Sequence, residues 1–119
     1  MSERSLRLGR AGEDAALETY RAHGYSLIAR NWRCDVGEVD LIVRRGGTLV
    51  VCEVKTRRGQ ALGGGYEAVT RSKQQRLRRL AAAFLSEHRE HRGSPVRFDV
   101  ASVSLREQRL IVRVFEDAF

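Results

Sequence analysis

The order of hydrophobic and polar positions predicts two helices and five strands. Residues 8–23 are rich in alanine and lead into Gly24, a residue type that commonly ends helices. Residues 70–91 carry an apolar stripe at helical spacing, and Ser72 with Gln75 matches a capping box near its start. Alternating and apolar segments predict the strands, over residues 25–32, 38–44, 49–56, 97–105 and 109–115.

This order, α-β-β-β-α-β-β, predicts an α/β fold in which helices flank a central mixed five-stranded sheet. At 119 residues, the chain is expected to form one domain over residues 1–119. It has no apolar run of about 18 residues and no apolar leader, so we expect a cytoplasmic protein that does not enter a membrane. Residues 59–65 are glycine-rich but lack the ending of a phosphate-binding P-loop, so we interpret them as a loop or lid.

The second and third strands are predicted to form a hairpin around a two-residue turn at Gly46 and Gly47. If these glycines form the turn, counting outward along the strands places Asp40 opposite Glu53. The same register places Glu38 opposite Lys55. One face of the hairpin is apolar, and the other carries these four charges at its open end. The apolar face consists of Val39, Leu41, Val43, Val50, Cys52 and Val54.

Two carboxylates at opposed positions of a hairpin repel each other, because their Cβ atoms are only about 5 Å apart. A divalent metal ion between Asp40 and Glu53 would remove this repulsion, and Mg²⁺ suits one or two carboxylates with water and phosphate oxygens. Such an ion can activate water for phosphodiester hydrolysis. Lys55 points to the same face as Glu53 and would orient or deprotonate that water, or neutralise the transition state. Glu38 would tune Lys55 by pairing with it, or ligate the metal itself.

Glu13, on the first predicted helix, is a further candidate ligand. The small residues around it would allow the helix to approach the sheet closely, so that Glu13 reaches the metal from above the hairpin. These small residues are Gly9, Ala11, Gly12 and Ala16. The structural alternative is a solvated acid that complements the helix dipole.

The charges of the hairpin also have structural alternatives. Glu38 and Lys55 could form a plain cross-strand ion pair, which would be only weakly stabilising. Asp40 and Glu53 would be exposed and well separated if the register differed by one residue.

The remaining chemistry-bearing residues do not predict a zinc site. Cys34 and Cys52 have neither metal-ligand nor disulfide spacing, and Cys52 alternates with apolar neighbours as a buried hydrophobe would. The histidines do not cluster; they are His23, His88 and His91. Asp99 is interpreted as structural, through pairing with Arg97 or capping of a helix.

A net charge of +7 and an isoelectric point of about 10.4 favour an anionic partner, above all nucleic acid. Basic residues crowd the start of the second helix, where positive charge opposes the helix dipole. A phosphate backbone is one explanation for them, and solvated arginines are the other. The prevalence of arginine over lysine is also typical of GC-rich genomes. The candidate nucleic-acid-binding residues are Arg57, Arg71, Lys73, Arg76 and Arg79.

An aspartate, a hairpin and a Glu-x-Lys motif, preceded by a helix with a glutamate, resemble the PD-(D/E)XK nuclease superfamily. The order of the site residues looks closest to archaeal Holliday-junction resolvases. More specifically, nearly the whole chain is similar to the YraN-like family of small bacterial proteins. The matching segments are residues 9–16, 31–33, 37–42, 53–57, 68–69 with Lys73, 97–100 and 118–119.

This resemblance implies a restriction endonuclease-like fold. It implies that Asp40 and Glu53 are metal ligands, that Lys55 is the catalytic lysine and that Glu13 is the helix glutamate of the resolvase branch. Val39 stands where the superfamily motif has proline. The implied cofactor is Mg²⁺, with Mn²⁺ as a substitute. By the same analogy we expect a homodimer with one site per subunit, which suits the cutting of two strands.

The leading hypothesis is therefore a Mg²⁺-dependent endonuclease that hydrolyses phosphodiester bonds in DNA rather than RNA, on branched or damaged structures. No helix-turn-helix or zinc-finger motif is found in the sequence, so recognition is expected through shape and phosphates. One alternative is a non-catalytic nucleic-acid-binding module on a nuclease-like fold. Another is an interaction protein whose arginines contact an acidic protein surface.

Overall fold

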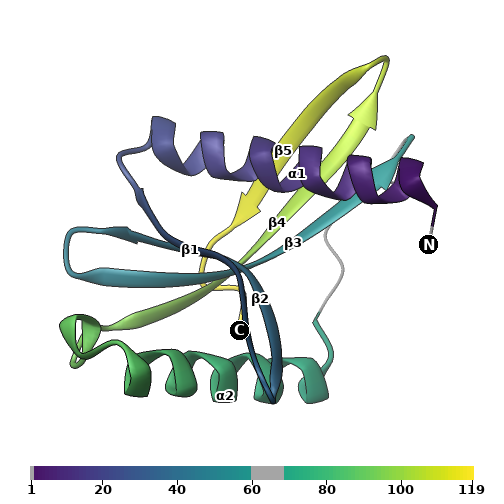
Figure 1. Ribbon diagram of the computed structural model, residues 1–119. Helices are drawn as coiled ribbons and strands as arrows, with labels where there is room; N and C mark the ends of the chain where they lie inside the picture. The colour runs from purple at the N-terminus through teal and green to yellow at the C-terminus, as the bar shows by residue number, and fades with distance from the viewer. Residues whose placement is uncertain (1, 60–68) are drawn as a thin grey trace.

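A five-stranded mixed β-sheet lies between two α-helices in the computed structural model of this chain, which describes residues 2–59 and 69–119 (Figure 1). The elements are α1 (Glu3–Ala22), β1 (Ser26–Cys34), β2 (Gly37–Arg45), β3 (Thr48–Arg58), α2 (Arg71–Glu87), the short 3₁₀ helix η2 (Arg89–His91), β4 (Val96–Arg106) and β5 (Arg109–Phe115). The predicted α/β class, mixed five-stranded sheet and element order are confirmed.

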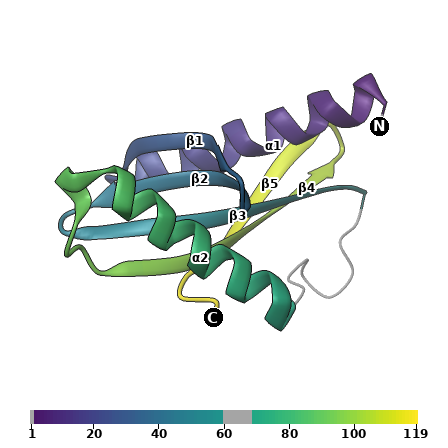
Figure 2. The same cartoon turned by 60° about the horizontal axis from the view of Figure 1, so that its bottom comes forward.

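The strands lie side by side in chain order, β1-β2-β3-β4-β5. Only the β3–β4 pair is parallel; the other three neighbouring pairs are antiparallel. A parallel connection needs a long crossover, and α2 lies in it. Figure 2 shows the result: α2 crosses one face of the sheet while α1 runs behind the other.

Two apolar clusters hold these layers together. On one face, Leu17 and Tyr20 of α1 pack with Leu41 of β2 and its buried neighbours. On the other face, Leu80 and Phe84 of α2 pack with apolar residues of β2, β3 and β4. Burying both faces in this way explains why the central strands are apolar almost throughout.

The alternation of β2 changes at Asp40. Leu41 packs on the α1 side, but Val39, which strict alternation would place beside it, packs on the α2 side. The prediction that Val39 shares the apolar face of Leu41 is therefore wrong. The adjoining stretch of β1 turns at Asn31, whose φ is 53°, and Asp40 bonds to Val54 through its side chain. This local irregularity lies within the candidate site.

The helix boundaries differ from those predicted. α1 begins at Glu3, because the side chain of Ser2 accepts a hydrogen bond from the Ser5 amide and caps the helix. The cap of α2 is Thr70, which accepts from the Lys73 amide, and the predicted capping box at Ser72 is wrong. α2 ends at Glu87, four residues before the predicted end, and η2 follows.

Strand β1 covers Ser26–Cys34 and contains a bulge between Leu27 and Ala29, which explains why apolar residues fall on both of its faces. The glycine-rich stretch interpreted as a loop or lid lies outside the described residues, except for Gly59. In the part of the chain that the structure describes, neither helix has the length and apolar character needed to cross a bilayer.

Asp99 ties α1 to the sheet and to the C-terminal segment. Its side chain is fully buried and accepts hydrogen bonds from the Tyr20 hydroxyl at 2.7 Å and the Asp117 amide at 3.1 Å. Arg97 donates to both of its oxygens at 2.9 Å. Burial raises the pKa of Tyr20, which keeps the hydroxyl a neutral donor. The predicted structural role through pairing with Arg97 is confirmed.

Candidate functional site

The β2–β3 hairpin has the predicted register. Arg45 pairs with Thr48 across the Gly46-Gly47 turn, and the regular pairing ends at Leu41 and Cys52. At the next position the Asp40 side chain, rather than the backbone, bonds to β3: its Oδ2 accepts the Val54 amide hydrogen at 2.8 Å. The Asp40 carboxyl group is thereby fixed against β3.

Asp40 and Glu53 form a pair of interacting carboxyl groups. Burial raises the pKa of Asp40 to about 8, and a hydrogen bond with Glu53 raises it in the same direction. The nearby charges of Glu53 and Glu13 add to this effect, whereas the Val54 amide opposes it. The sheet therefore holds two acidic groups together at some electrostatic cost, which a bound cation would relieve.

Glu53 is buried on β3, and its side chain is only 11% exposed. Its Oε2 forms an ion pair with the Lys73 ammonium of α2, yet it accepts no hydrogen bond of ordinary geometry. Thr70 caps the α2 turn that carries Lys73. One oxygen of this buried carboxylate is thus left with a charge partner but without a directional donor.

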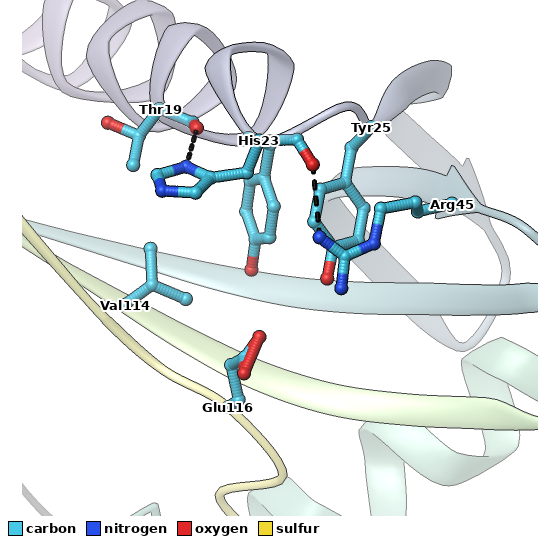
Figure 3. A pocket seen from close by; sticks show the side chains of 7 residues that line it. Thr19, His23, Tyr25, Arg45, Val114 and Glu116 are labelled. Atoms are coloured by element: carbon cyan, nitrogen blue, oxygen red, sulfur yellow. Dashed lines mark hydrogen bonds between the residues drawn. The ribbon is translucent and has the colours of Figure 1, made fainter.

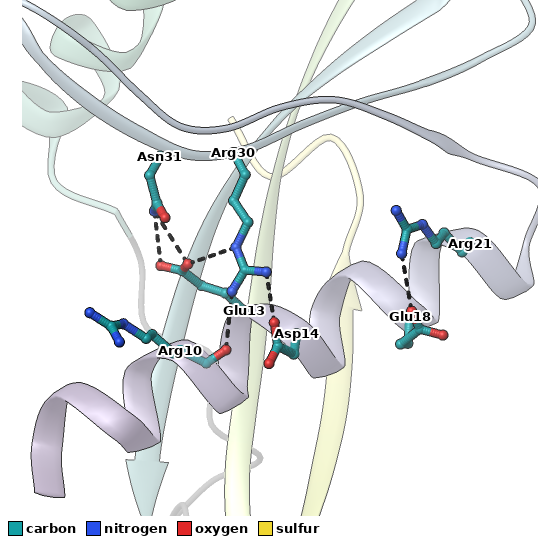
Figure 4. A network of polar contacts seen from close by, with 7 residues as sticks. All are labelled: Arg10, Glu13, Asp14, Glu18, Arg21, Arg30 and Asn31. Atoms are coloured by element: carbon teal, nitrogen blue, oxygen red, sulfur yellow. Dashed lines mark hydrogen bonds and ion pairs between the residues drawn. The ribbon is translucent and has the colours of Figure 1, made fainter.

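Glu13 of α1 is held by residues of β1 (Figure 4), and its charge contributes to the raised pKa of Asp40. Asn31 donates to both of its carboxylate oxygens, at 3.2 and 3.3 Å, and Arg30 donates to one of them at 3.2 Å. The same Arg30 binds Asp14 at 2.6 Å and the Arg10 carbonyl at 3.2 Å. At 17% exposure, the Glu13 side chain is a fixed part of the α1–β1 interface rather than a solvated acid.

Lys55 lies on β3 two positions beyond Glu53, on the same face of the strand, and it is half-buried. Across residues 2–59 and 69–119, no ion pair or hydrogen bond of its ammonium group is found. Glu38, which was expected to face it, instead forms an ion pair with Arg33 of β1 at 3.2 Å. Among the described residues, Glu38 is thus not the partner of Lys55.

These residues fit a divalent cation held by two carboxylates. Within the described residues, no three His, Cys, Asp or Glu side chains converge closely enough to hold a metal ion together. Asp40 and Glu53 do lie together, and Mg²⁺ is commonly bound by one or two carboxylates with water and phosphate oxygens. The Glu53 oxygen without a hydrogen bond is a hard donor suited to that ion.

The predicted nucleic-acid-binding residues do not form one uniform group. On α2, Arg71, Arg76 and Arg79 are exposed, whereas Lys73 pairs with Glu53 inside the site. Arg57 lies on β3, one residue before that strand ends. Their neighbour Arg78 lies over the rings of Phe98 and Phe119, so it helps to close the core.

A pocket of about 460 Å³ lies apart from the carboxylates, at the end of α1 (Figure 3). Its lining residues are Thr19, Tyr20, His23, Tyr25, Arg45, Val114 and Glu116. Arg45 stacks over the Tyr25 ring at 4.5 Å and donates to the His23 carbonyl at 3.0 Å. These polar groups already have partners, so we assign the pocket no chemistry.

Three residues that shape the site have no role predicted from the sequence. Arg30 and Asn31 fix Glu13, and Thr56 is the β3 residue against which Gly12 of α1 lies. Asn31 falls in one of the matching family segments, which is the only signal that could have drawn attention to it. The close α1–β3 approach was expected from the small residues of α1, and it is confirmed.

The fold and the site define an α/β protein with two interacting carboxyl groups, half-buried Asp40 and buried Glu53, at the open end of a β-hairpin. The chain belongs to the uncharacterised protein family UPF0102, which matches residues 12–103. This confirms the expected YraN-like family.

Relatives extend the similarity over most of the chain. A UPF0102 protein of Parafrankia sp. (strain EAN1pec) is 52% identical over 110 residues, covering 92% of each chain. A UPF0102 protein of Symbiobacterium thermophilum is 50% identical over 119 residues, covering 97% of this chain and 98% of its own. A third, from Roseiflexus castenholzii, is 42% identical over 114 residues, covering 94% and 92%.

Proposed function

We propose that this protein is a metal-dependent endonuclease of the PD-(D/E)XK superfamily, with a restriction endonuclease-like fold, which hydrolyses phosphodiester bonds in DNA. The observation that carries the proposal is the interacting pair of half-buried Asp40 and buried Glu53, with Lys55 two positions beyond Glu53 on the same face of β3. A hairpin needed only for stability would not hold two carboxyl groups so close together. Pairs of interacting carboxyl groups with a shifted pKa are common where a protein binds a cation or a reacting group.

Asp40 and Glu53 would hold Mg²⁺, or Mn²⁺ in its place. When bound, such an ion supplies Lewis acidity and a water molecule of lowered pKa for attack on phosphorus. The Val54 amide keeps Asp40 facing β3 through its 2.8 Å hydrogen bond. Lys55 carries a positive charge without a partner in the described residues, so it is suited to orient water or to stabilise charge on the phosphate.

The basic surface supplies the affinity for DNA. The net charge is +7, and Arg71, Arg76 and Arg79 are exposed on α2, the helix whose Lys73 contacts Glu53. Contacts of this kind bind phosphates without reading bases, so binding should weaken steeply as salt increases. Branched or damaged DNA and a homodimer with one site per subunit are part of this proposal.

The second candidate function is a DNA-binding module without catalysis. The observation that favours it is the Lys73–Glu53 ion pair, which already neutralises one of the carboxylates without a metal. If the protein is a DNA-binding module without catalysis, replacing Asp40 or Glu53 would leave its DNA affinity unchanged.

One experiment separates the two functions. Labelled single strands, duplexes, nicked duplexes and four-way junctions are incubated with the protein and Mg²⁺ or Mn²⁺, beside Asp40→Asn, Glu53→Gln and Lys55→Met. Exposed Asp35→Asn is the matched control. Metal-dependent cleavage lost in all three site variants, but not in the control, supports the nuclease. DNA binding that survives in every variant, without cleavage of any substrate, overturns it.

A further inference from the structure

The chain contains only two lysines, and both border Glu53. All the other residues among the 22 basic ones are arginine. Lys55 follows Glu53 by two positions on the same face of β3, and Lys73 contacts its carboxylate from α2. An arginine bias from genome composition does not explain why the two lysines stand at these two places.

Lysine and arginine differ in how firmly they hold a carboxylate. The guanidinium group binds carboxylates through two parallel hydrogen bonds, whereas the ammonium group is a compact charge on a flexible stem. At Asp99, where the contact is structural, the chain uses an arginine: Arg97 donates to both oxygens. At Glu53 it uses a lysine, and the contacted Oε2 has no hydrogen bond of ordinary geometry. The Lys73–Glu53 contact can therefore be broken more easily than the Arg97–Asp99 contact.

The backbone that carries Lys73 is firmly placed. Thr70 accepts the Lys73 amide hydrogen at 3.2 Å, and Gln74 donates to the Val69 carbonyl at 2.9 Å. The Lys73 side chain is 35% exposed, so its ammonium group can leave Glu53 for solvent or a ligand without movement of the helix. Exposed Arg71 and Arg76 lie on either side of it in the sequence, on the helix proposed to face DNA.

We propose that Lys73 is an exchangeable counter-charge for Glu53, an inference that rests on the metal site of the proposed function. In the metal-free protein its ammonium group neutralises the buried carboxylate. When a divalent cation is bound, Lys73 is released from Glu53 and contacts a phosphate of the bound DNA. Lys73 is therefore a positioning residue that couples metal binding to DNA binding.

The first test is calorimetric titration of metal-stripped protein with Mn²⁺. Lys73→Met removes the competing charge, so we expect it to bind Mn²⁺ about tenfold more tightly than the unaltered chain, within the usual range for groups in contact. Arg71→Met removes one charge from the same turn without contacting Glu53, and we expect a change of less than about twofold. Lys73→Arg keeps the charge and the fold but holds Glu53 in two hydrogen bonds, so its Mn²⁺ affinity should fall.

The second test measures DNA affinity against salt in a Lys55→Met background, which prevents cleavage. With Mn²⁺ present, Lys73→Met should reduce the slope of log affinity against log salt by about 1, the value for one phosphate contact. Without Mn²⁺ the slope should not change, because Lys73 is then held by Glu53. This dependence on metal would not follow from a merely structural lysine.

The outcomes separate this inference from the proposed function. Tighter Mn²⁺ binding by Lys73→Met and a metal-dependent salt slope support the exchange, even if no DNA is cleaved. Mn²⁺ affinity that is unchanged or weaker in Lys73→Met, or unchanged in Lys73→Arg, overturns it, even if the unaltered chain cleaves DNA. A salt slope that falls equally with and without Mn²⁺ also overturns it. Failure of every variant to bind Mn²⁺ overturns both.

Discussion

Gly12 of α1 lies directly against Thr56 of β3. A Cβ atom built at Gly12 would be 1.9 Å from the Thr56 Oγ1 and 2.9 Å from its Cβ. Only a residue without a side chain allows the helix to come this close to the sheet. The next residue along the helix is Glu13, so this contact also sets how near its carboxylate comes to the hairpin.

We expect Gly12→Ala to destabilise the protein by about 1–3 kcal/mol, because the added methyl group must push α1 away from β3. Gly9→Ala is the matched control, since a Cβ at that position has no atom within 4 Å apart from its chain neighbours and the backbone of its own helix. The control should stabilise the helix slightly, by up to about 1 kcal/mol. Urea unfolding of both variants measures the difference. Equal stabilities would show that α1 does not approach β3 as described.

The Asn31 side chain and its backbone make separable contributions. Its φ of 53° suits glycine and asparagine but strains alanine, and its amide group donates to both oxygens of Glu13. Asn31→Gly loses only the hydrogen bonds, whereas Asn31→Ala also acquires the strain. We therefore expect Asn31→Ala to be about 1 kcal/mol less stable than Asn31→Gly in thermal unfolding. The reverse order would contradict a left-handed backbone at this position.

The buried Asp99 should be far more sensitive to substitution than its exposed neighbour Glu116. Asp99→Ala leaves Arg97 without its main partner and removes the acceptor of the Tyr20 hydroxyl, so a loss of about 3–5 kcal/mol is expected. Glu116 also pairs with Arg97, at 3.1 Å, but its side chain is 56% exposed. Glu116→Gln should therefore cost less than about 1 kcal/mol. Chemical denaturation compares the two, and similar losses would argue against this hierarchy.

The carboxylate pair was predictable because it depends on local geometry. A Gly-Gly turn between two apolar strands fixes the hairpin register as far as Leu41 and Cys52, which brings the next residues, Asp40 and Glu53, together. The same counting failed two residues farther from the turn, where Glu38 pairs with Arg33 instead of Lys55. The alternation changes at Asp40, and strand periodicity contains no information about such an irregularity.

Contacts between distant segments could not be predicted in this way. The Lys73–Glu53 ion pair depends on where the crossover helix α2 comes to lie on the sheet, which side-chain packing decides. The hydrogen bonds from Arg30 and Asn31 to Glu13 depend on the β1 bulge and on the positive φ at Asn31. Positive charge in the first turn of α2 is unusual for a helix. One of these basic residues, Lys73, contacts Glu53 of the same chain.

The raised pKa of Asp40 predicts how the stability of the metal-free protein depends on pH. The pKa is about 8 in the folded protein against 3.8 as its ordinary value. The folded state therefore binds the Asp40 proton more tightly than the unfolded state, and stability should fall as pH rises through this window. Asn resembles a protonated Asp and can still accept the Val54 amide hydrogen. Asp40→Asn should thus match the unaltered chain near pH 4 and exceed its stability by about 2 kcal/mol near pH 8.5.

Urea unfolding in the presence of a chelator, at a series of pH values, measures this difference. Asp35→Asn, at an exposed position, serves as the control and should change stability by less than about 0.5 kcal/mol throughout. A gain in stability on replacing Asp40 would mean that the fold keeps this carboxyl group at a cost, as expected of a residue retained for binding a cation. If Asp40→Asn were instead less stable at pH 8.5, the carboxylate would be stabilising the fold, and the electrostatic argument for a cation at this site would fail.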